Sequence, residues 1–295
     1  MKIEIDVNTR KFKRQESEQV EKMKIVEKLW KTGDIKMQSK AQRMNDCCSN
    51  ILLKVCPNCL NHTISSEQLC RERLCPTCAR ISASEHFVET MKCIEIAETK
   101  HMFCVLFLTL TIRNVKVESL RAGMQILSKG FTRLMRCLNK SVKGYARSIE
   151  ITYNEGDNTY HPHIHSLLLC EQSTYIPHTE LIKKWRKATQ ADYDPSVRIN
   201  RVDVSKSERV AAACAECCKY ALKSSDIAVK TDSIEILSEQ LRNVRTYSTG
   251  GILKEQRAAA RQSIKAGKTE TRECRKCGEL IEVVRGEWNG SGYSF

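Results

Sequence analysis

Three of the seven histidines in this chain, His161, His163 and His165, lie at alternate positions in the stretch NTYHPHIHSLLL. Alternate side chains of a β-strand point to the same face of a sheet, so a strand here would place the three imidazoles side by side. Packing desolvated imidazoles together costs free energy unless something compensates, and a metal ion does so. One such histidine would be explained by packing in a core. A row of three predicts a metal site.

A carboxylate lies within reach of this row. The segment GYARSIEITYN, the turn EGDNT and the segment YHPHIHSLLLC predict a β-hairpin that brings Glu150 near the histidines. Three-histidine zinc is one option. A His-x-His pair with an acid from the neighbouring strand, suited to Mg²⁺ or Mn²⁺ near phosphates, is the other. The third ligand is therefore either Glu150 or His161.

Cysteine spacing predicts a second kind of metal site. Cys56-Pro-Asn-Cys59 and Cys75-Pro-Thr-Cys78 are separated by fifteen residues, the spacing of a four-cysteine zinc site built from two tight turns. Burial alone would not explain why both pairs share the pattern C-P-x-C. Cys70, five residues before Cys75, is a candidate to replace one of these four ligands.

Two further C-x-x-C pairs have a different environment. Cys214 and Cys217 lie in an alanine-rich segment that predicts a helix, where small buried side chains need no metal. Cys274 and Cys277 resemble half of a zinc ribbon. No cysteine or histidine follows them, so a complete site would need partners from a distant segment or a second chain.

Composition narrows the class of partner. The 295 residues carry a formal net charge of +14, which favours a polyanionic partner, either nucleic acid or an anionic membrane. The longest apolar run, MFCVLFLTLTI, has the length of a strand, and the N-terminus has no apolar signal segment. We therefore expect a cytoplasmic protein with no membrane association. In that reducing compartment, sixteen cysteines favour metal sites or buried thiols over disulfides.

Periodicity predicts an α+β fold with an antiparallel sheet flanked by helices. Strands are expected at 103–112, 144–154, 160–170 and 197–204, and helices at 14–30, 120–138, 178–189 and 207–225. The strongest helix has one apolar stripe, formed by Leu120, Met124, Leu127, Phe131, Leu134 and Leu138. The basic helix at 178–189 is a candidate to contact DNA through Lys183, Lys184, Arg186 and Lys187.

The sequence predicts four parts of the chain. Residues 1–46 form a basic helical arm and residues 47–80 a cysteine-rich zinc-binding module. Residues 81–253 form the main α+β domain, and residues 254–295 a basic tail that contains C-x-x-C.

The order of these motifs resembles a known family. HPHIH after RSIEITYN, the upstream FLTLT and the downstream ECCKYALK are similar to the three motifs of HUH endonucleases. The cysteine-rich front and the later RTYSTGG narrow the resemblance to the replication initiator proteins of small rolling-circle plasmids. It covers roughly residues 56 to 255. The resemblance implies an HUH-type sheet and metal-assisted, tyrosine-mediated nicking of single-stranded DNA, with Mg²⁺ or Mn²⁺ at the site.

The resemblance also assigns roles to residues. His163 and His165 match the metal-binding pair, and Glu150 matches the acid that many members carry on the adjacent strand. We favour Glu150 over His161 as the third ligand. The resemblance implies a 5′-phosphotyrosine link and a 3′-hydroxyl primer.

The nucleophile motif falls on Tyr220, with Lys223 after it, and Glu216 occupies the position associated with hydrolysis in this subgroup. A helix over 207–225 would place these three side chains on one face. Without the metal motif, Tyr220 would be read as an ordinary half-buried tyrosine. If Glu216 does not complete the second cleavage, a tyrosine from a second subunit would have to, which requires a homodimer.

The expected partners are single-stranded or extruded origin DNA and the host replicative or repair helicase and polymerase. Two other functions are compatible with part of the pattern: a transposase or mobilisation relaxase with the same HUH core, and a non-enzymatic zinc-dependent DNA-binding protein. Both functions are compatible with the positive net charge and the cysteine-rich segments of this chain. The non-enzymatic protein leaves Glu150 and the Glu216–Tyr220–Lys223 set without a role.

Overall fold

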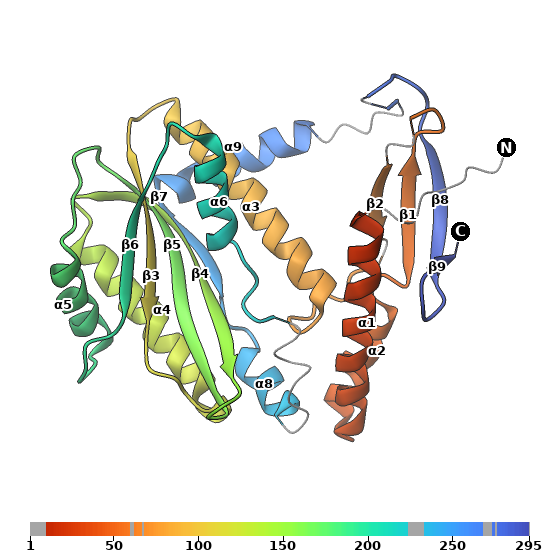
Figure 1. Ribbon diagram of the computed structural model, residues 1–295, viewed down its shortest axis with the longest axis horizontal. Helices are drawn as coiled ribbons and strands as arrows, with labels where there is room; N and C mark the ends of the chain where they lie inside the picture. Colours follow the sequence, from red (N-terminus) through yellow and green to blue (C-terminus); the bar gives the residue numbers. More distant parts are fainter. Residues whose placement is uncertain are drawn as a thin grey trace. The chain divides into compact units, whose positions relative to one another are not determined.

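The computed structural model describes residues 10–59, 62–66, 68–223, 233–267, 273–274 and 276–294. The chain forms two compact units (Figure 1). The first unit comprises residues 1–79, 227–235 and 268–295. The second unit comprises residues 80–226 and 236–267. The first unit therefore draws mainly on the two ends of the chain, and most of the sequence between them belongs to the second unit.

The second unit is built on a five-stranded sheet. Its order is β6-β3-β5-β4-β7, and each neighbouring pair is antiparallel. The strands are β3 (Cys104–Thr111), β4 (Val142–Asn154), β5 (Thr159–Cys170), β6 (Val197–Val202) and β7 (Tyr247–Gly251). The predicted hairpin is confirmed: β4 and β5 pair from Asn154↔Thr159 onward across a short turn in which Asn158 has a φ of 55°. Asparagine tolerates this left-handed conformation.

Helices cover both faces of this sheet, which confirms the α+β class. One face is covered by α3 (Pro76–Glu98), α6 (Ser207–Cys217) and α9 (Ile252–Gly267), which enclose a core with Leu167 and Leu169 of β5. The residues of α3 from Arg80 onward belong to this unit. On the other face lies α4 (Leu120–Cys137), whose Phe131 makes an edge contact with Tyr145 of β4. The short 3₁₀ turn η1 (Val117–Ser119) leads into α4.

The apolar stripe predicted for residues 120–138 is buried as expected, with Met124, Leu127 and Leu134 at 0% exposure. The basic helix α5 (His178–Thr189) packs against α4. Gly130 permits this close approach, because a Cβ there would lie 2.9 Å from the Thr189 methyl group. Within the same unit, the Arg121 main-chain N–H donates to Gln240 near the end of α8 (Ile234–Leu241).

The first unit pairs two helices with a small sheet. Helix α1 (Arg10–Lys31) packs on α2 (Ile35–Asp46), and the sheet has the order β2-β1-β8-β9. Its strands are β1 (Asn50–Val55), β2 (His62–Ser66), β8 (Glu282–Trp288) and β9 (Tyr293–Ser294). The helices expected in the basic arm at 1–46 are present, but they pack into the first unit rather than standing apart from it. Under their charged surface these helices bury Ile25, Leu29 and Met44, so they belong to the core of this unit.

The predicted tail at 254–295 is wrong as a single segment. Helix α9 belongs to the second unit, whereas β8 and β9 belong to the first. Strand β8 pairs with β1 over six positions, from Asn50↔Glu287 to Val55↔Glu282. The reason is that β1 has two edges whose main-chain groups need partners, and β2 satisfies only one of them.

The predicted helix at 207–225 ends early. Helix α6 ends at Cys217, and the chain then leaves the helix so that the Ala221 carbonyl accepts a hydrogen bond of 2.6 Å from the main-chain N–H of Ile151. Leu222 forms a parallel bridge with Ile151. Because Tyr220 and Lys223 follow the helix, the argument that they share a helix face with Glu216 fails. Satisfying the edge of β4 outweighs helix propensity here.

No helix within the described part of the chain is long and apolar enough to cross a membrane.

Candidate active site and cysteine clusters

The histidine row lies on β5, the central strand of the second unit's sheet. His163 is directly opposite Glu150 of β4, and His165 is opposite Thr109 of β3. Neighbouring rings are in contact, with centroids 5.4 Å apart for His161 and His163 and 4.9 Å apart for His163 and His165. The prediction that the three imidazoles share one face of a strand is confirmed.

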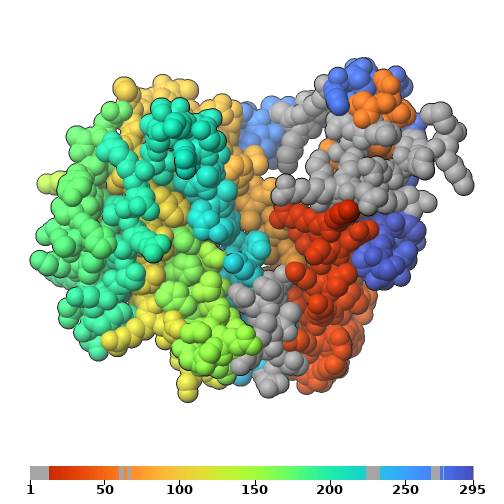
Figure 2. All heavy atoms as spheres, in the orientation of Figure 1, coloured from red at the N-terminus to blue at the C-terminus, as the bar shows by residue number. Residues whose placement is uncertain are grey.

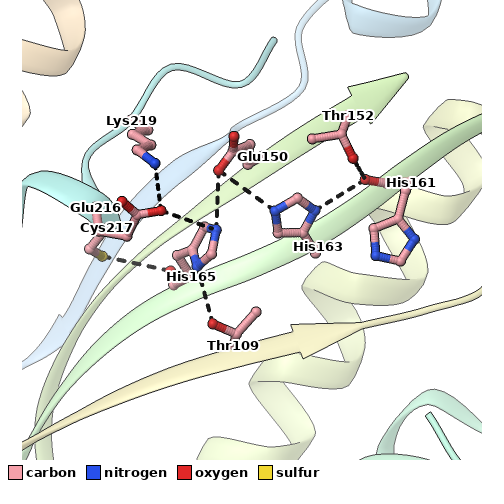
Figure 3. Close-up of polar contacts among 9 residues, drawn as sticks. All are labelled: Thr109, Glu150, Thr152, His161, His163, His165, Glu216, Cys217 and Lys219. Carbon is pink, nitrogen blue, oxygen red and sulfur yellow. Dashed lines mark hydrogen bonds and ion pairs between the residues drawn. The ribbon is translucent and has the colours of Figure 1, made fainter. Parts of the chain in front are cut away.

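Three of these side chains converge on a small volume (Figure 3). Glu150 Oε2 lies 3.1 Å from His165 Nε2 and 3.6 Å from His163 Nε2. Their ligand atoms are close enough to share one ion. The Glu150 carboxylate is 8% exposed and the two histidine side chains 11–12%, so the group is sheltered but open to one side.

His161 is turned away from this group in Figure 3. Its Nδ1 lies 2.7 Å from Asn114 Oδ1. Burial, together with the charge of His163, lowers the pKa of His161. Of the two candidate third ligands, the structure brings Glu150 to the histidine pair and holds His161 against Asn114.

The hydrogen bond at Nδ1 of His163 determines whether its Nε2 carries a proton or a lone pair. His163 Nδ1 lies 3.1 Å from the His161 carbonyl oxygen, which can only accept, so Nδ1 carries a proton and donates. In a neutral His163, Nε2 then presents a lone pair toward the Glu150 carboxylate. Two acceptors facing one another repel unless a proton or a cation lies between them. A donor set of two imidazole nitrogens and one carboxylate oxygen fits a divalent cation.

The charge state of Glu150 agrees with this picture. Burial raises the pKa of Glu150, but its interactions with His163 and His165 outweigh burial and hold that pKa well below its usual value. The carboxylate is therefore ionised at neutral pH, as a metal ligand must be.

Two residues that the sequence analysis did not assign to this site hold His165 in place. Thr109 Oγ1 lies 3.2 Å from His165 Nδ1, the ring nitrogen that faces away from Glu150. The buried Cys217 thiol donates to the Ala146 carbonyl at 3.3 Å and to the His165 carbonyl at 3.6 Å. Such outer contacts fix the orientation of a ligand ring. Thr109 could have been found from strand alternation in FLTLT, whereas Cys217 required the packing of α6.

Of the three residues assigned to the nucleophile motif, Glu216 reaches the same site with its side chain. Glu216 Oε1 lies 3.9 Å from His165 Nε2 and 2.6 Å from Lys219 Nζ (Figure 3). Tyr220 is half-buried, and its neighbour Ala221 is hydrogen-bonded to Ile151, the residue after Glu150. Lys223 is exposed. The main chain at Tyr220 thus runs along the strand that carries Glu150.

The basic residues of α5 lie on the outer side of that helix. Leu181, Trp185 and Ala188 are buried, whereas Lys183, Arg186 and Lys187 are exposed and Lys184 is half-buried. Lys184 pairs with Glu180 at 2.5 Å, and Arg186 pairs with Asp194 at 3.1 Å. In Figure 2 this green segment lies on the surface of the second unit.

The cysteines form two clusters rather than one, so the prediction of a single site from Cys56, Cys59, Cys75 and Cys78 is wrong. Cys75 and Cys78 lie with Cys70 and Cys47, and Cys56 and Cys59 lie with Cys274 and Cys277. The two C-P-x-C turns are kept apart because one follows β1 and the other opens α3. The sequence analysis missed Cys47, although the adjacent pair Cys47-Cys48 directly precedes β1.

The Cys47 cluster (Cys47, Cys70, Cys75 and Cys78) is compact and mostly buried. Cys78 Sγ lies 3.5 Å from that of Cys47 and 3.6 Å from that of Cys70. Thiol hydrogen bonds from Cys48, Cys70, Cys75 and Cys78 hold the pKa of Cys47 well below its usual value. The main-chain N–H groups of Cys70 and Arg71 donate to the sulfurs of Cys47 and Cys78.

A buried ammonium lies beside this cluster. Lys22 is 0% exposed, and its Nζ donates to the carbonyl oxygens of Cys47 at 2.7 Å and Asn45 at 3.1 Å. Burial lowers the pKa of Lys22, and the negative charge of the cysteines opposes that effect. A buried cation is retained only where negative charge compensates it, and four thiolates around one divalent ion would carry that charge.

Comparison with known proteins agrees with a role on DNA. The second unit combines a five-stranded antiparallel sheet with a His-x-His pair and a carboxylate, and the chain is strongly basic. Residues 61–292 match the replication protein family, and the chain belongs to that family.

Individual relatives carry matching descriptions. The chain is 32% identical to a "Protein rep" of Bacillus amyloliquefaciens, over 73% of this chain and 71% of that protein. It is 34% identical to a "Protein rep" of Lactiplantibacillus plantarum, over 63% of this chain and 64% of that protein. It is also 32% identical to a "Replication protein" of Staphylococcus aureus, over 58% of this chain and 80% of that protein. No solved structure matches the chain.

Proposed function

We propose that this protein initiates rolling-circle replication of a plasmid by nicking one strand of origin DNA. Tyr220 is the nucleophile, and Glu150, His163 and His165 hold a Mg²⁺ or Mn²⁺ ion. Membership of the replication protein family supports the role in replication, and the resemblance to HUH endonucleases supports the chemistry. The protein acts in the cytoplasm, where plasmid DNA is replicated.

One observation carries this proposal. The segment that follows Tyr220 is hydrogen-bonded to Ile151, next to Glu150 on β4. A main-chain bond between these neighbours ties the tyrosine segment to the strand that carries the candidate metal ligand. That juxtaposition is what a nucleophile needs when the scissile phosphate is held by the ligand group.

The cation, when bound, would polarise the scissile phosphate and offset charge in the transition state. Tyr220 Oη forms a bond to phosphorus as the bond from phosphorus to the 3′-oxygen breaks. The phenol loses its proton and the departing oxygen gains one, which leaves a 5′-phosphotyrosine and a 3′-hydroxyl. A phenol with a pKa of about 10 is a weak nucleophile at neutral pH, and Lys223 supplies positive charge near it.

The second cleavage that ends a round needs another nucleophile. In this proposal Glu216, whose Oε1 lies 3.9 Å from His165 Nε2, accepts a proton from water at the same phosphate site. Lys219 at 2.6 Å keeps that carboxylate oriented. The substrate is single-stranded or extruded DNA, because a tyrosine beside a sheet must reach an exposed phosphate. The 3′-hydroxyl then passes to the host polymerase and helicase.

The Cys47 cluster is proposed as a structural zinc site. Its four sulfurs converge within the range of one tetrahedral ion, and the neighbouring Lys22 supports a negatively charged centre. This replaces the expected ligand set with Cys47, Cys70, Cys75 and Cys78.

The nicking reaction tests the proposal. Purified protein is incubated with supercoiled origin plasmid and Mn²⁺ or Mg²⁺, and the nick and any covalent DNA adduct are mapped. Tyr220→Phe should eliminate the adduct and nearly all nicking, because the attacking oxygen is gone. Glu216→Ala should retain the first nick and the adduct in this assay, and cells that replicate the plasmid with this variant should accumulate over-replicated single-stranded DNA.

Tyr153→Phe serves as the matched control, because it removes a phenol from the same sheet and should nick normally. An adduct that persists in Tyr220→Phe would show that another residue is the nucleophile. Normal termination by Glu216→Ala would reduce that carboxylate to an ion-pair partner of Lys219.

A further inference from the structure

The geometry points to a second zinc ion in this protein, bound by Cys56, Cys59, Cys274 and Cys277, that joins the two ends of the chain. These four residues are called the ribbon cluster below. The site is independent of the nicking chemistry, since all four residues belong to the first unit.

Strand pairing brings the two C-x-x-C turns of the ribbon cluster together. Cys56 directly follows Val55, the last residue of β1. Val55 is paired with Glu282, the first residue of β8, and Cys274 and Cys277 precede that strand. Both turns therefore lie at the same end of the small sheet, the upper end in Figure 1.

The sulfur positions fit a single tetrahedral ion. Cys56 Sγ lies 3.3 Å from Cys277 Sγ, and Cys59 Sγ lies 3.5 Å from Cys274 Sγ and 3.6 Å from Cys277 Sγ. Four sulfurs bound at about 2.3 Å to one zinc lie roughly 3.8 Å apart. These separations exceed the roughly 2.05 Å of a disulfide bond. A multi-iron cluster would hold its thiolates farther apart than this group does.

The turns also supply donors for thiolate sulfur. The Cys59 main-chain N–H donates to Cys56 Sγ at 3.5 Å. The main-chain N–H groups of Lys276 and Cys277 are hydrogen-bonded to the sulfur of Cys274. Gly278, with a φ of 78°, closes the second turn through its N–H to the Cys274 carbonyl at 2.8 Å. Such donors stabilise the negative charge that metal-bound thiolates carry.

Ordinary burial does not explain the ribbon cluster. Cys277 is exposed and Cys59 is half-buried. The nearby core of the sheet, formed by Ile51, Leu53, Val55 and Tyr293, is small. A small sheet with few buried residues needs a further cross-link, and a metal between segments 215 residues apart supplies one.

Metal analysis and thiol reactivity of the full chain test the inference. Wild-type protein purified under reducing conditions should contain two zinc ions per chain, one in each cluster. Cys277→Ser should lose one zinc and keep the other, Cys75→Ser should do the same, and the double variant should hold none. Cys137→Ser, which removes an exposed cysteine in α4, should keep both.

Alkylation gives a readout that does not depend on folding of a variant. Cys137 and Cys277 are both exposed, so an unprotected Cys277 should react as fast as Cys137. We expect iodoacetamide to modify Cys137 and to spare Cys277 until a chelator removes the metal. Equal modification of Cys137 and Cys277 in native protein would overturn the second zinc site. So would a zinc content of one per chain that is lost in Cys75→Ser and kept in Cys277→Ser. If a single zinc is lost only in Cys277→Ser, the ribbon site stands and zinc in the Cys47 cluster fails.

Discussion

The two units hold their candidate metal ligands in opposite ways. In the second unit, two imidazoles and one carboxylate project from neighbouring strands and leave one side open. In the first unit, each cluster offers four cysteine sulfurs. Four thiolates saturate a tetrahedral ion, whereas three mixed ligands leave positions for a substrate. In the proposed assignments, this difference separates a catalytic site from sites that stabilise the fold.

The two cysteine clusters differ from each other as well. The Cys47 cluster is largely buried and has the ammonium of Lys22 beside it. The ribbon cluster has one exposed and one half-buried cysteine, Cys277 and Cys59, and main-chain N–H groups donate to its sulfurs. Losing metal from the buried cluster should therefore leave an uncompensated cation in a core, and the cost in stability should be larger there.

The largest effect on stability is expected from Cys75→Ser. It should release one zinc and lower the free energy of unfolding of the first unit by several kcal/mol, about 5 or more, because structural zinc binding is coupled to folding. Zinc content and thermal unfolding measured by circular dichroism check this, with Cys137→Ser as the control. Unchanged zinc content and unfolding temperature in Cys75→Ser would contradict the account of the buried cluster.

The smallest effect is expected on α5. Lys183→Ala or Lys187→Ala should weaken DNA binding modestly and reduce the slope of log affinity against log salt by about one per lost phosphate contact. Lys184→Ala and Arg186→Ala should have less effect, because Glu180 and Asp194 already pair with those charges. Binding measured at several salt concentrations distinguishes them. Equal slopes for all four variants and wild type would show that α5 is a solvated face.

Local patterns predicted the active-site sheet well. The histidines, Glu150 and their hairpin lie within one stretch of chain, so strand alternation and one turn were enough to place them on the same face. The buried apolar stripe of α4 was predicted equally well, because helical periodicity depends only on residues close in sequence.

The cysteine pairing could not be read in this way. Cys56 and Cys277 are brought together by the pairing of β1 with β8, which joins segments at opposite ends of the chain. The early end of α6 depends on a hydrogen bond to Ile151, again a contact distant in sequence. In both cases the residues near the motif in sequence do not indicate which distant segment it contacts.

Cleavage and binding measured together on ligand variants test the central claim most directly. Origin nicking with Mn²⁺ and affinity for single-stranded origin DNA are compared for wild type, His165→Ala and Glu150→Gln, with His161→Ala as the matched control. We expect nicking by His165→Ala and Glu150→Gln to fall by roughly 10³-fold or more, since one ion supplies several kcal/mol of transition-state stabilisation. DNA affinity should stay nearly unchanged because phosphate contacts dominate it, and His161→Ala should retain most of its activity. Wild-type nicking rates in His165→Ala and Glu150→Gln would contradict the assignment of this site.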